Sequence, residues 1–255
     1  MKVAWVSHQL PRDDDAPAPS SALLPGRYAG GAELLQDLMR SRAPSDVDWV
    51  LVDPRHADDE LSDLDGCDRV VVGAVEALRP AQVHALRPHR PLVWLMSAQS
   101  PRSLPVMEMA SPLVWASADM MRWFPWAPDG EVCQGWFDTS EVPYSEQRDG
   151  TALWAARDHP QKGRMNARVW AAQRGLTLRE MTNAPRADVL HAMSTASHFV
   201  LLANGWDPGP VACLEAAIAG CEVHTNAKVG RAPVEGRQAT IDWVESMPAR
   251  FYGWL

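Results

Sequence analysis

Short apolar runs recur along the chain, and their recurrence constrains the fold more than any other feature of the sequence. Segments with helical periodicity lie between several of these runs, among them Ala32–Arg40 and Arg164–Arg174, which ends at Gly175. Strands that alternate with helices form parallel sheets covered on both faces, so the pattern predicts an α/β fold. The runs are Val3–Ser7, Trp49–Val52, Arg69–Gly73, Leu92–Met96, Leu113–Ser117, Leu153–Ala156, His198–Ala203 and Glu222–Thr225.

The series of runs starts a second time after the polar segment Asp138–Gly150, which contains Pro143. Such a segment is typical of a linker between compact domains, and 255 residues suffice for two of them. We therefore expect two Rossmann-like lobes that face a central cleft. The expected parts are a first lobe over residues 1–138, a linker over 139–150, a second lobe over 151–238, and a C-terminal segment over 239–255 that returns to the first lobe.

Composition excludes several classes of protein. Hydrophobic residues make up 46% of the chain and charged residues 22%, which is typical of a globular protein and not of a disordered or fibrous one. The 4 cysteines lie far apart without a C-x-x-C pair, so neither a zinc site nor a disulfide framework is indicated. His56, His84 and His89 lack ligand spacing, and we expect no metal site.

The sequence also bears on location and on partners. It shows neither a signal-like start nor an apolar run near the roughly 20 residues that span a bilayer, so we expect a cytoplasmic protein. The net charge of −8 argues against bulk nucleic-acid binding and leaves a local basic groove open.

A long loop, His8–Ala29, follows the first predicted strand and contains Asp13, Asp14 and Asp15. Loops of this length in compact domains are usually functional or disordered. Because open α/β sheets bind ligands beyond the carboxyl ends of their strands, the loop would stand over the cleft. A lid and a disordered insertion remain alternatives.

Two cations follow the first strand of the predicted second lobe. Arg157 ends that strand, and Lys162-Gly163 opens a helix five residues later. Both cations would lie at the carboxyl edge of the sheet, where they would neutralise a diphosphate and stabilise its charge as a leaving group. Arginine and lysine are also common at strand ends, so this spacing alone leaves an ordinary surface pair open.

A second motif begins at Asp207 and continues through Pro208, Gly209, Pro210 and Val211 to Glu215. Proline suits the first turn of a helix, and Gly220 would close it. Free backbone N–H groups at such a helix start favour phosphate. One turn inside, Glu215 would accept hydrogen bonds from the two hydroxyls of a ribose, and Asp207 would reach a transferred sugar.

The segment Leu153–Gly230 resembles the C-terminal lobe of retaining GT-B glycosyltransferases, particularly the glycosyltransferase family 4-like group. Arg157, Lys162 and Gly163 match the family's Gly-Arg-x4-Lys-Gly pattern, with Ala156 in place of the first glycine. Its E-x7-E motif appears here as D-x7-E, from Asp207 to Glu215, and is followed by the expected Ala-Gly-Cys. The chain is shorter than is usual for the family.

The resemblance implies specific roles for these residues. Arg157, Lys162 and Asp207 would be catalytic, and Glu215 would bind the ribose of a nucleoside-diphosphate sugar, most simply of the UDP type. The remaining implied donor contacts are Gly30, Gly31, Gly209, Pro210 and Val211. The family's first-lobe histidine is missing, and Ser97 and Gln99 are the substitutes available to contact sugar or acceptor.

The resemblance further implies transfer of a hexose with retention, without a cofactor or a metal ion. The small size and the Arg-, Ala- and Trp-rich composition resemble phage glycosyltransferases, some of which modify 5-hydroxymethylpyrimidines in DNA. For a phage protein the expected location is the host cytoplasm. A glycan, a protein and a small metabolite remain alternative acceptors. The rival interpretation is an inactive sugar-nucleotide-binding module or an epimerase, because Asp207 replaces a glutamate and the first-lobe histidine is absent.

Overall fold

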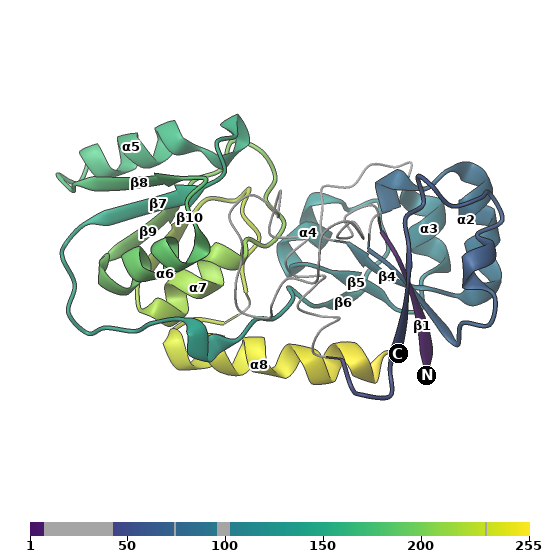
Figure 1. The fold of residues 1–255 in the computed structure, drawn as a ribbon. Helices are drawn as coiled ribbons and strands as arrows, with labels where there is room; N and C mark the ends of the chain where they lie inside the picture. Colours follow the sequence, from purple (N-terminus) through teal and green to yellow (C-terminus); the bar gives the residue numbers. More distant parts are fainter. Residues whose placement is uncertain (8–42, 74, 96–102, 233) are drawn as a thin grey trace.

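The computed structural model describes residues 1–7, 43–73, 75–95, 103–232 and 234–255 (Figure 1). Within these ranges the chain forms two α/β lobes, each built around a parallel sheet, which confirms the predicted fold class. The predicted helix Ala32–Arg40 and the loop His8–Ala29 lie outside the described residues.

The first lobe contains a 6-stranded sheet in the order β2-β1-β3-β4-β5-β6. All its neighbouring strands are parallel, and the inner strands β1, β3, β4 and β5 are buried on both faces, as is usual for parallel sheets, whereas the edge strands β2 and β6 are partly exposed. The strands are β1 (Lys2–Val6), β2 (Asp48–Val52), β3 (Arg69–Val72), β4 (Leu92–Leu95), β5 (Leu113–Trp115) and β6 (Glu131–Val132).

One face of this sheet packs on short helices through Ala4, Val6 and Val72, which share a core with buried residues of α2, α3 and α4. The helices are α2 (Pro80–Leu86), α3 (Leu104–Met109) and α4 (Ala118–Trp123). The 3-10 turns of this lobe are η1 (Ser62–Leu64), η2 (Val75–Ala77) and η3 (Arg87–His89).

The second lobe contains a 4-stranded parallel sheet in the order β10-β9-β7-β8. Alternate residues of β7 lie on opposite faces, so that Ala152 and Trp154 pack on α5 while Leu153 and Ala155 join the core under α6 and α7. The strands are β7 (Ala152–Ala156), β8 (Leu178–Thr182), β9 (His198–Leu201) and β10 (Glu222–Thr225). The helices are α5 (Arg164–Ala172), α6 (Arg186–Thr195) and α7 (Val211–Ala219), and η6 (Pro160–Lys162) is a 3-10 turn. Another 3-10 turn, η5 (Thr139–Glu141), lies in the linker segment between the two sheets.

The C-terminal helix α8 (Arg237–Gly253) runs along both lobes (Figure 1). Near its start, Arg237 donates to the carbonyl of Ile218 at the end of α7 (3.0 Å). Near its end, Phe251 is fully buried, with its ring centroid 6.1 Å from those of Trp5 and Trp94. Side chains of both lobes and of α8 therefore form one continuous hydrophobic core.

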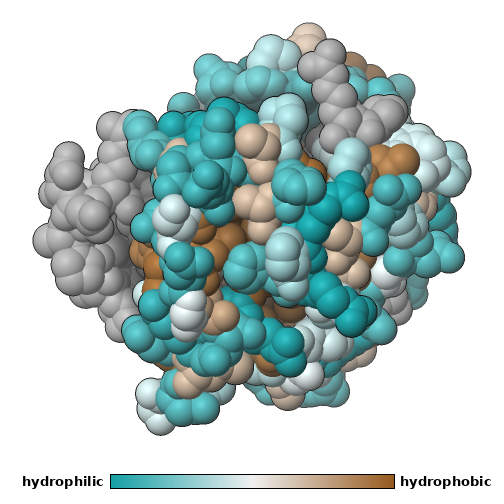
Figure 2. Space-filling view, turned by 90° about the vertical axis from the view of Figure 1, so that its right-hand side faces the viewer, coloured by the Kyte–Doolittle hydropathy of each residue, from teal (hydrophilic) through white to brown (hydrophobic). Residues whose placement is uncertain are grey.

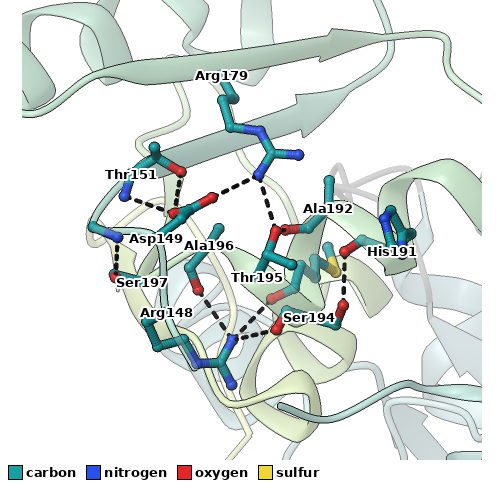
Figure 3. A network of polar contacts seen from close by, with 12 residues as sticks. Arg148, Asp149, Thr151, Arg179, His191, Ala192, Ser194, Thr195, Ala196 and Ser197 are labelled. Carbon is teal, nitrogen blue, oxygen red and sulfur yellow. Dashed lines mark hydrogen bonds and ion pairs between the residues drawn. The ribbon is translucent and has the colours of Figure 1, made fainter. Parts of the chain in front are cut away.

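The linker is fixed to the second lobe at its end by Arg148 (Figure 3). The guanidinium donates to the carbonyls of Met193, Ser194 and Ala196, each at 3.1 Å, and to that of Ala219. These carbonyls lie at the C-terminal ends of α6 and α7, where a cation is favoured. One arginine thus holds two helices and the linker together.

The outer surface is mixed in character. Viewed from the end of the first lobe, it is mostly hydrophilic, with several separate hydrophobic patches (Figure 2). No helix among the described residues is both long and apolar enough to cross a membrane.

Candidate functional site

The candidate site lies at the carboxyl edge of the second-lobe sheet, where the sequence places its two motifs. Arg157 follows β7, and Asp207 follows β9. The two loops are joined by backbone hydrogen bonds, since Asn204 N–H donates to the carbonyl of Gln161 (2.8 Å). Ligands of open α/β sheets bind at this edge, because loops and helix starts converge there.

Lys162 and Asp207 form an ion pair at the centre of this edge, with 2.6 Å between Nζ and Oδ2. Their side chains are only 25% and 11% exposed, so the pair is partly shielded from water. The ammonium group is held in one place by the carboxylate, yet solvent still reaches it. Such a lysine is available to an anionic ligand that approaches this edge of the sheet.

Gly163 sets the position of Lys162. Its φ is +67°, and a Cβ atom there would lie 1.9 Å from the carbonyl oxygen of Leu202 at the end of β9. Only glycine permits both the left-handed backbone and this approach. Gly163 therefore allows the loop after β7 to pack directly against the end of β9, beside Asp207.

The backbone around Asp207 is held by a second segment of the chain. Its N–H donates to the carbonyl of Lys228, and its carbonyl accepts from the N–H of Gly230, both at 2.8 Å. A Cβ atom on Gly230 would lie 2.0 Å from the carbonyl oxygen of Pro208 and 2.2 Å from Oγ of Ser117. This second glycine contact brings the loop of the second lobe directly against the first lobe.

Helix α7 begins beside Asp207, with Pro210 as its N-cap and Val211 as its first residue. The preceding Gly209 faces the first lobe, since a Cβ atom there would lie 3.1 Å from the side chain of Gln134 and 3.2 Å from the carbonyl oxygen of Ala116. The positive end of the α7 dipole is therefore directed toward the junction of the lobes.

Glu215 lies inside α7 and is bound by an arginine that the sequence motifs did not include. Its Oε1 accepts from Nε of Arg186 (2.7 Å), and a second nitrogen of Arg186 contacts Glu141 of η5 (2.8 Å). Burial alone would lower the pKa of Arg186, but the two carboxylates outweigh it and raise the pKa above its ordinary value. The third guanidinium nitrogen is buried without a hydrogen-bond partner among the described residues. Arg186 therefore orients Glu215 and retains one unused donor.

Arg157 is exposed, and no side chain among the described residues pairs with its guanidinium. Four of the predicted contacts, Gly30, Gly31, Ser97 and Gln99, lie outside the described residues. The structure thus brings Lys162, Asp207 and the start of α7 together and leaves Arg157 at the same edge.

Several further polar residues at this site were not predicted. Lys228 contributes a second ammonium, which donates to the carbonyl of Asn204 (2.7 Å). Ser117 and Gln134 are buried at the junction of the lobes, each with a side-chain atom that has no partner among the described residues. Ser117 and Gln134 lie far from the motifs in sequence, although Ser117 ends one of the predicted strands. Lys228 lies inside the segment Leu153–Gly230 but outside both motifs.

The fold is similar to that of solved glycosyltransferase structures of the GT-B type. AviGT4, a glycosyltransferase involved in avilamycin A biosynthesis, has a TM-score of 0.58 and 15% identity, over 98% of this chain and 92% of that chain. Alr3699/HepE of Anabaena, in a complex with UDP, has a TM-score of 0.55 and 14% identity, over 98% and 91%. No protein-family model and no curated protein matches the sequence. The chain therefore has a two-lobed, Rossmann-like GT-B fold.

Proposed function

We propose that the protein is a glycosyltransferase that moves a sugar from a nucleoside-diphosphate donor to an acceptor hydroxyl. The observation that carries the proposal is the meeting of Lys162, Asp207 and the start of α7 at one sheet edge, directly against the first lobe. The likeness of the fold to glycosyltransferases, one of them in a complex with UDP, supports the same conclusion.

The donor lies mainly on the second lobe in this proposal. Lys162 and Arg157 bind the diphosphate, together with the backbone N–H groups at Gly209 and Val211. Glu215, oriented by Arg186, accepts hydrogen bonds from the ribose. Gly30 and Gly31 approach the phosphates from the first lobe, and Pro210 fixes the start of α7. The donor in this proposal is a UDP-sugar.

The chemical step is charge stabilisation on a leaving group. As the glycosidic bond breaks, negative charge grows on the diphosphate, and fixed cations beside it lower the energy of the transition state. Asp207 holds Lys162 in position and contacts the sugar. We propose transfer of a hexose with retention, in which the departing diphosphate accepts the proton of the acceptor hydroxyl on the same face of the sugar.

The proposed acceptor site is on the first lobe, with Ser97 and Gln99 as the contacts inferred from the sequence. Hydroxymethylated pyrimidines in DNA are the first acceptor class to test, and glycans, proteins and small metabolites are the others. Mass spectrometry of these acceptor pools after incubation with a mixture of nucleotide sugars identifies the product directly. A mass increase of one hexose on one pool supports the proposal.

Release of nucleoside diphosphate by the purified protein tests the proposal without a known acceptor. Slow release from one donor of a panel is expected, since water substitutes for the acceptor. If no donor is hydrolysed, transferred or bound, the proposal is wrong. If one donor is bound but never hydrolysed or transferred, the alternative of a binding module holds. Conversion of the donor sugar into an isomer would instead indicate an epimerase.

Calorimetry with UDP tests the donor site residue by residue. We expect Glu215→Gln to weaken binding, because loss of a charged hydrogen bond costs roughly 1.5–3 kcal/mol. The amide oxygen can still accept from Arg186, so the fold is preserved better than with alanine. Glu146→Gln, an exposed carboxylate of the linker, is the matched control and should bind UDP normally.

A further inference from the structure

A cluster of two histidines and one glutamate lies in the second lobe, outside the donor site. His198 is the first residue of β9, and Glu222 and His224 are the first and third residues of β10. Register places Glu222 directly beside His198, and residues two apart in a strand share a face. The three side chains therefore project from two neighbouring strands on the same side of the sheet.

The potential ligand atoms lie at the separations of a metal coordination shell. Nδ1 of His198 is 3.1 Å from Nε2 of His224, and the two oxygens of Glu222 lie 3.2 Å and 3.5 Å from those nitrogens. Tetrahedral Zn²⁺ with bonds of roughly 2.0–2.1 Å requires ligand atoms about 3.3 Å apart. One ring nitrogen of each histidine and the carboxylate of Glu222 thus lie close enough together to share one metal ion.

The surroundings suit a bound cation with one open position. Trp170 of α5 covers the two rings, with its centroid 4.3 Å from that of His224 and 5.7 Å from that of His198. The imidazoles are about three-quarters buried, at 24% and 22% exposure, whereas Glu222 is 67% exposed. One side of the cluster is therefore fixed by packing, while the other admits an ion and a water molecule.

We propose that His198, Glu222 and His224 form a binding site for a divalent transition metal ion, and that this ion is Zn²⁺. Two neutral imidazoles and a carboxylate are donors that zinc accepts, and water completes a fourth position. The site joins the edge strand β10 to β9 at the amino ends of these strands. The proposed donor site lies at their carboxyl ends, so the metal contributes to stability and not to sugar transfer.

Two measurements on the metal-free protein test the site: calorimetric titration with ZnCl₂, and thermal unfolding with and without ZnCl₂. We expect one Zn²⁺ per chain and a higher unfolding temperature in its presence. Loss of a group that only supports a metal ligand typically lowers metal affinity roughly 10–100-fold. His198→Ala and His224→Ala each remove a ligand itself, so each should weaken Zn²⁺ binding by at least that much. Glu222→Gln, which keeps the size of the side chain, should weaken binding without changing the fold.

Substitution with Co²⁺ provides a second readout, because Co²⁺ in a tetrahedral site absorbs visible light strongly. The matched control is His191→Ala, which removes an exposed histidine from α6 of the same lobe and should leave both readouts unchanged. Absence of stoichiometric binding by the wild-type protein overturns the proposal, and so does unchanged binding by the double variant of His198 and His224. In either case the cluster is a hydrogen-bonded histidine pair. Donor binding by Glu222→Gln stays normal whichever result is obtained, which keeps this test separate from that of the proposed function.

Discussion

Single glycines decide how closely the loops of the donor site approach each other. We predict that Gly163→Ala destabilises the protein by more than about 2 kcal/mol, because it adds both a left-handed alanine and a clash with Leu202. Gly175→Ala is the matched control, since its φ is +65° but nothing lies within 4 Å of the added atom. Urea denaturation of both variants measures the difference. Equal losses would show that the contact with Leu202 does not constrain the loop.

Arg157 and Lys162 should affect turnover more than folding. By analogy with the removal of one preorganised donor, alanine at either position is expected to lower kcat by on the order of 10²–10³. Lysine at position 157 should rescue activity only in part, because a point charge cannot replace the guanidinium fork. Steady-state kinetics on the identified acceptor measures the effect.

The control for this pair is Arg87→Ala, which removes an exposed arginine from the first lobe. It should leave kcat unchanged. Near-normal turnover by both Arg157→Ala and Lys162→Ala would contradict the assigned roles. Without ligand, the unfolding temperature of Arg157→Ala should be closer to that of the wild type than the unfolding temperature of Lys162→Ala. Arg157 has no side-chain partner among the described residues, whereas Lys162→Ala removes the ion pair with Asp207.

At the scale of secondary-structure elements, α5 is tied to the edge strand β8 by Glu180. Its carboxylate accepts from Arg168 (2.6 Å) and contacts Arg164. The hydrogen bond from Arg168 has the largest effect on the pKa of Glu180, and burial, the next largest, opposes it. With the hydrogen bond from Arg164 and the charges of both arginines, the pKa falls from 4.5 to about 2. The charged carboxylate therefore favours the folded state.

Because the folded-state pKa is the lower one, the contribution of Glu180 is fully present above pH 4.5. It is lost as the pH falls through about 2. We predict that Glu180→Gln is less stable than wild type at pH 7 and that the gap narrows steadily below pH 4.5. Chemical denaturation from pH 7 to pH 3 measures it. A gap that stays constant over this range would show that the ion pairs contribute nothing to stability.

The sequence predicted most strands of both sheets because their apolar runs are buried on two faces. It missed β8, whose residues Leu178–Thr182 mix charged and apolar side chains at the edge of the sheet, and the two-residue strand β6. It also missed Arg186, Glu141 and the histidine cluster. These side chains come from segments 26 to 45 residues apart, and only the strand register and the linker path bring them together.

At the scale of the whole molecule, α8 completes the core of the first lobe. We predict that Phe251→Ala costs about 3–5 kcal/mol, since it removes a fully buried ring from among Trp5, Trp94 and Trp136. Val169→Ala, at a 52% exposed position of α5, should change stability by less than about 0.5 kcal/mol. Equilibrium unfolding of both variants checks the prediction. A small loss for Phe251→Ala would mean that the helix end is only loosely docked.

Chelation should separate the two proposed sites. Activity is expected to survive EDTA, because side-chain cations and a helix N-terminus bind the diphosphate in the proposed mechanism. The unfolding temperature of zinc-loaded protein should fall with the same treatment. Complete loss of activity that magnesium or manganese restores would contradict this scheme of donor binding.

The two lobes also touch directly. The rings of Trp123 and Trp206 pack together with their centroids 4.7 Å apart and their planes tilted by 33°, and Nε1 of Trp123 donates to the carbonyl of Ala227 (3.1 Å). Asp119 of the first lobe accepts from the N–H of Arg231 (3.1 Å). These contacts surround the glycine contacts near Asp207, so movement between the lobes would open the proposed donor site.

The path of α8 has a consequence for synthesis of the chain on the ribosome. The second lobe is a continuous stretch, but the first lobe needs Phe251, which is translated only after the whole second lobe. Until then the faces of Trp5 and Trp94 that Phe251 covers stay open to water or to other chains. A nascent chain thus carries an exposed aromatic surface through most of its translation, and chaperones that recognise such surfaces are expected to bind it during that interval.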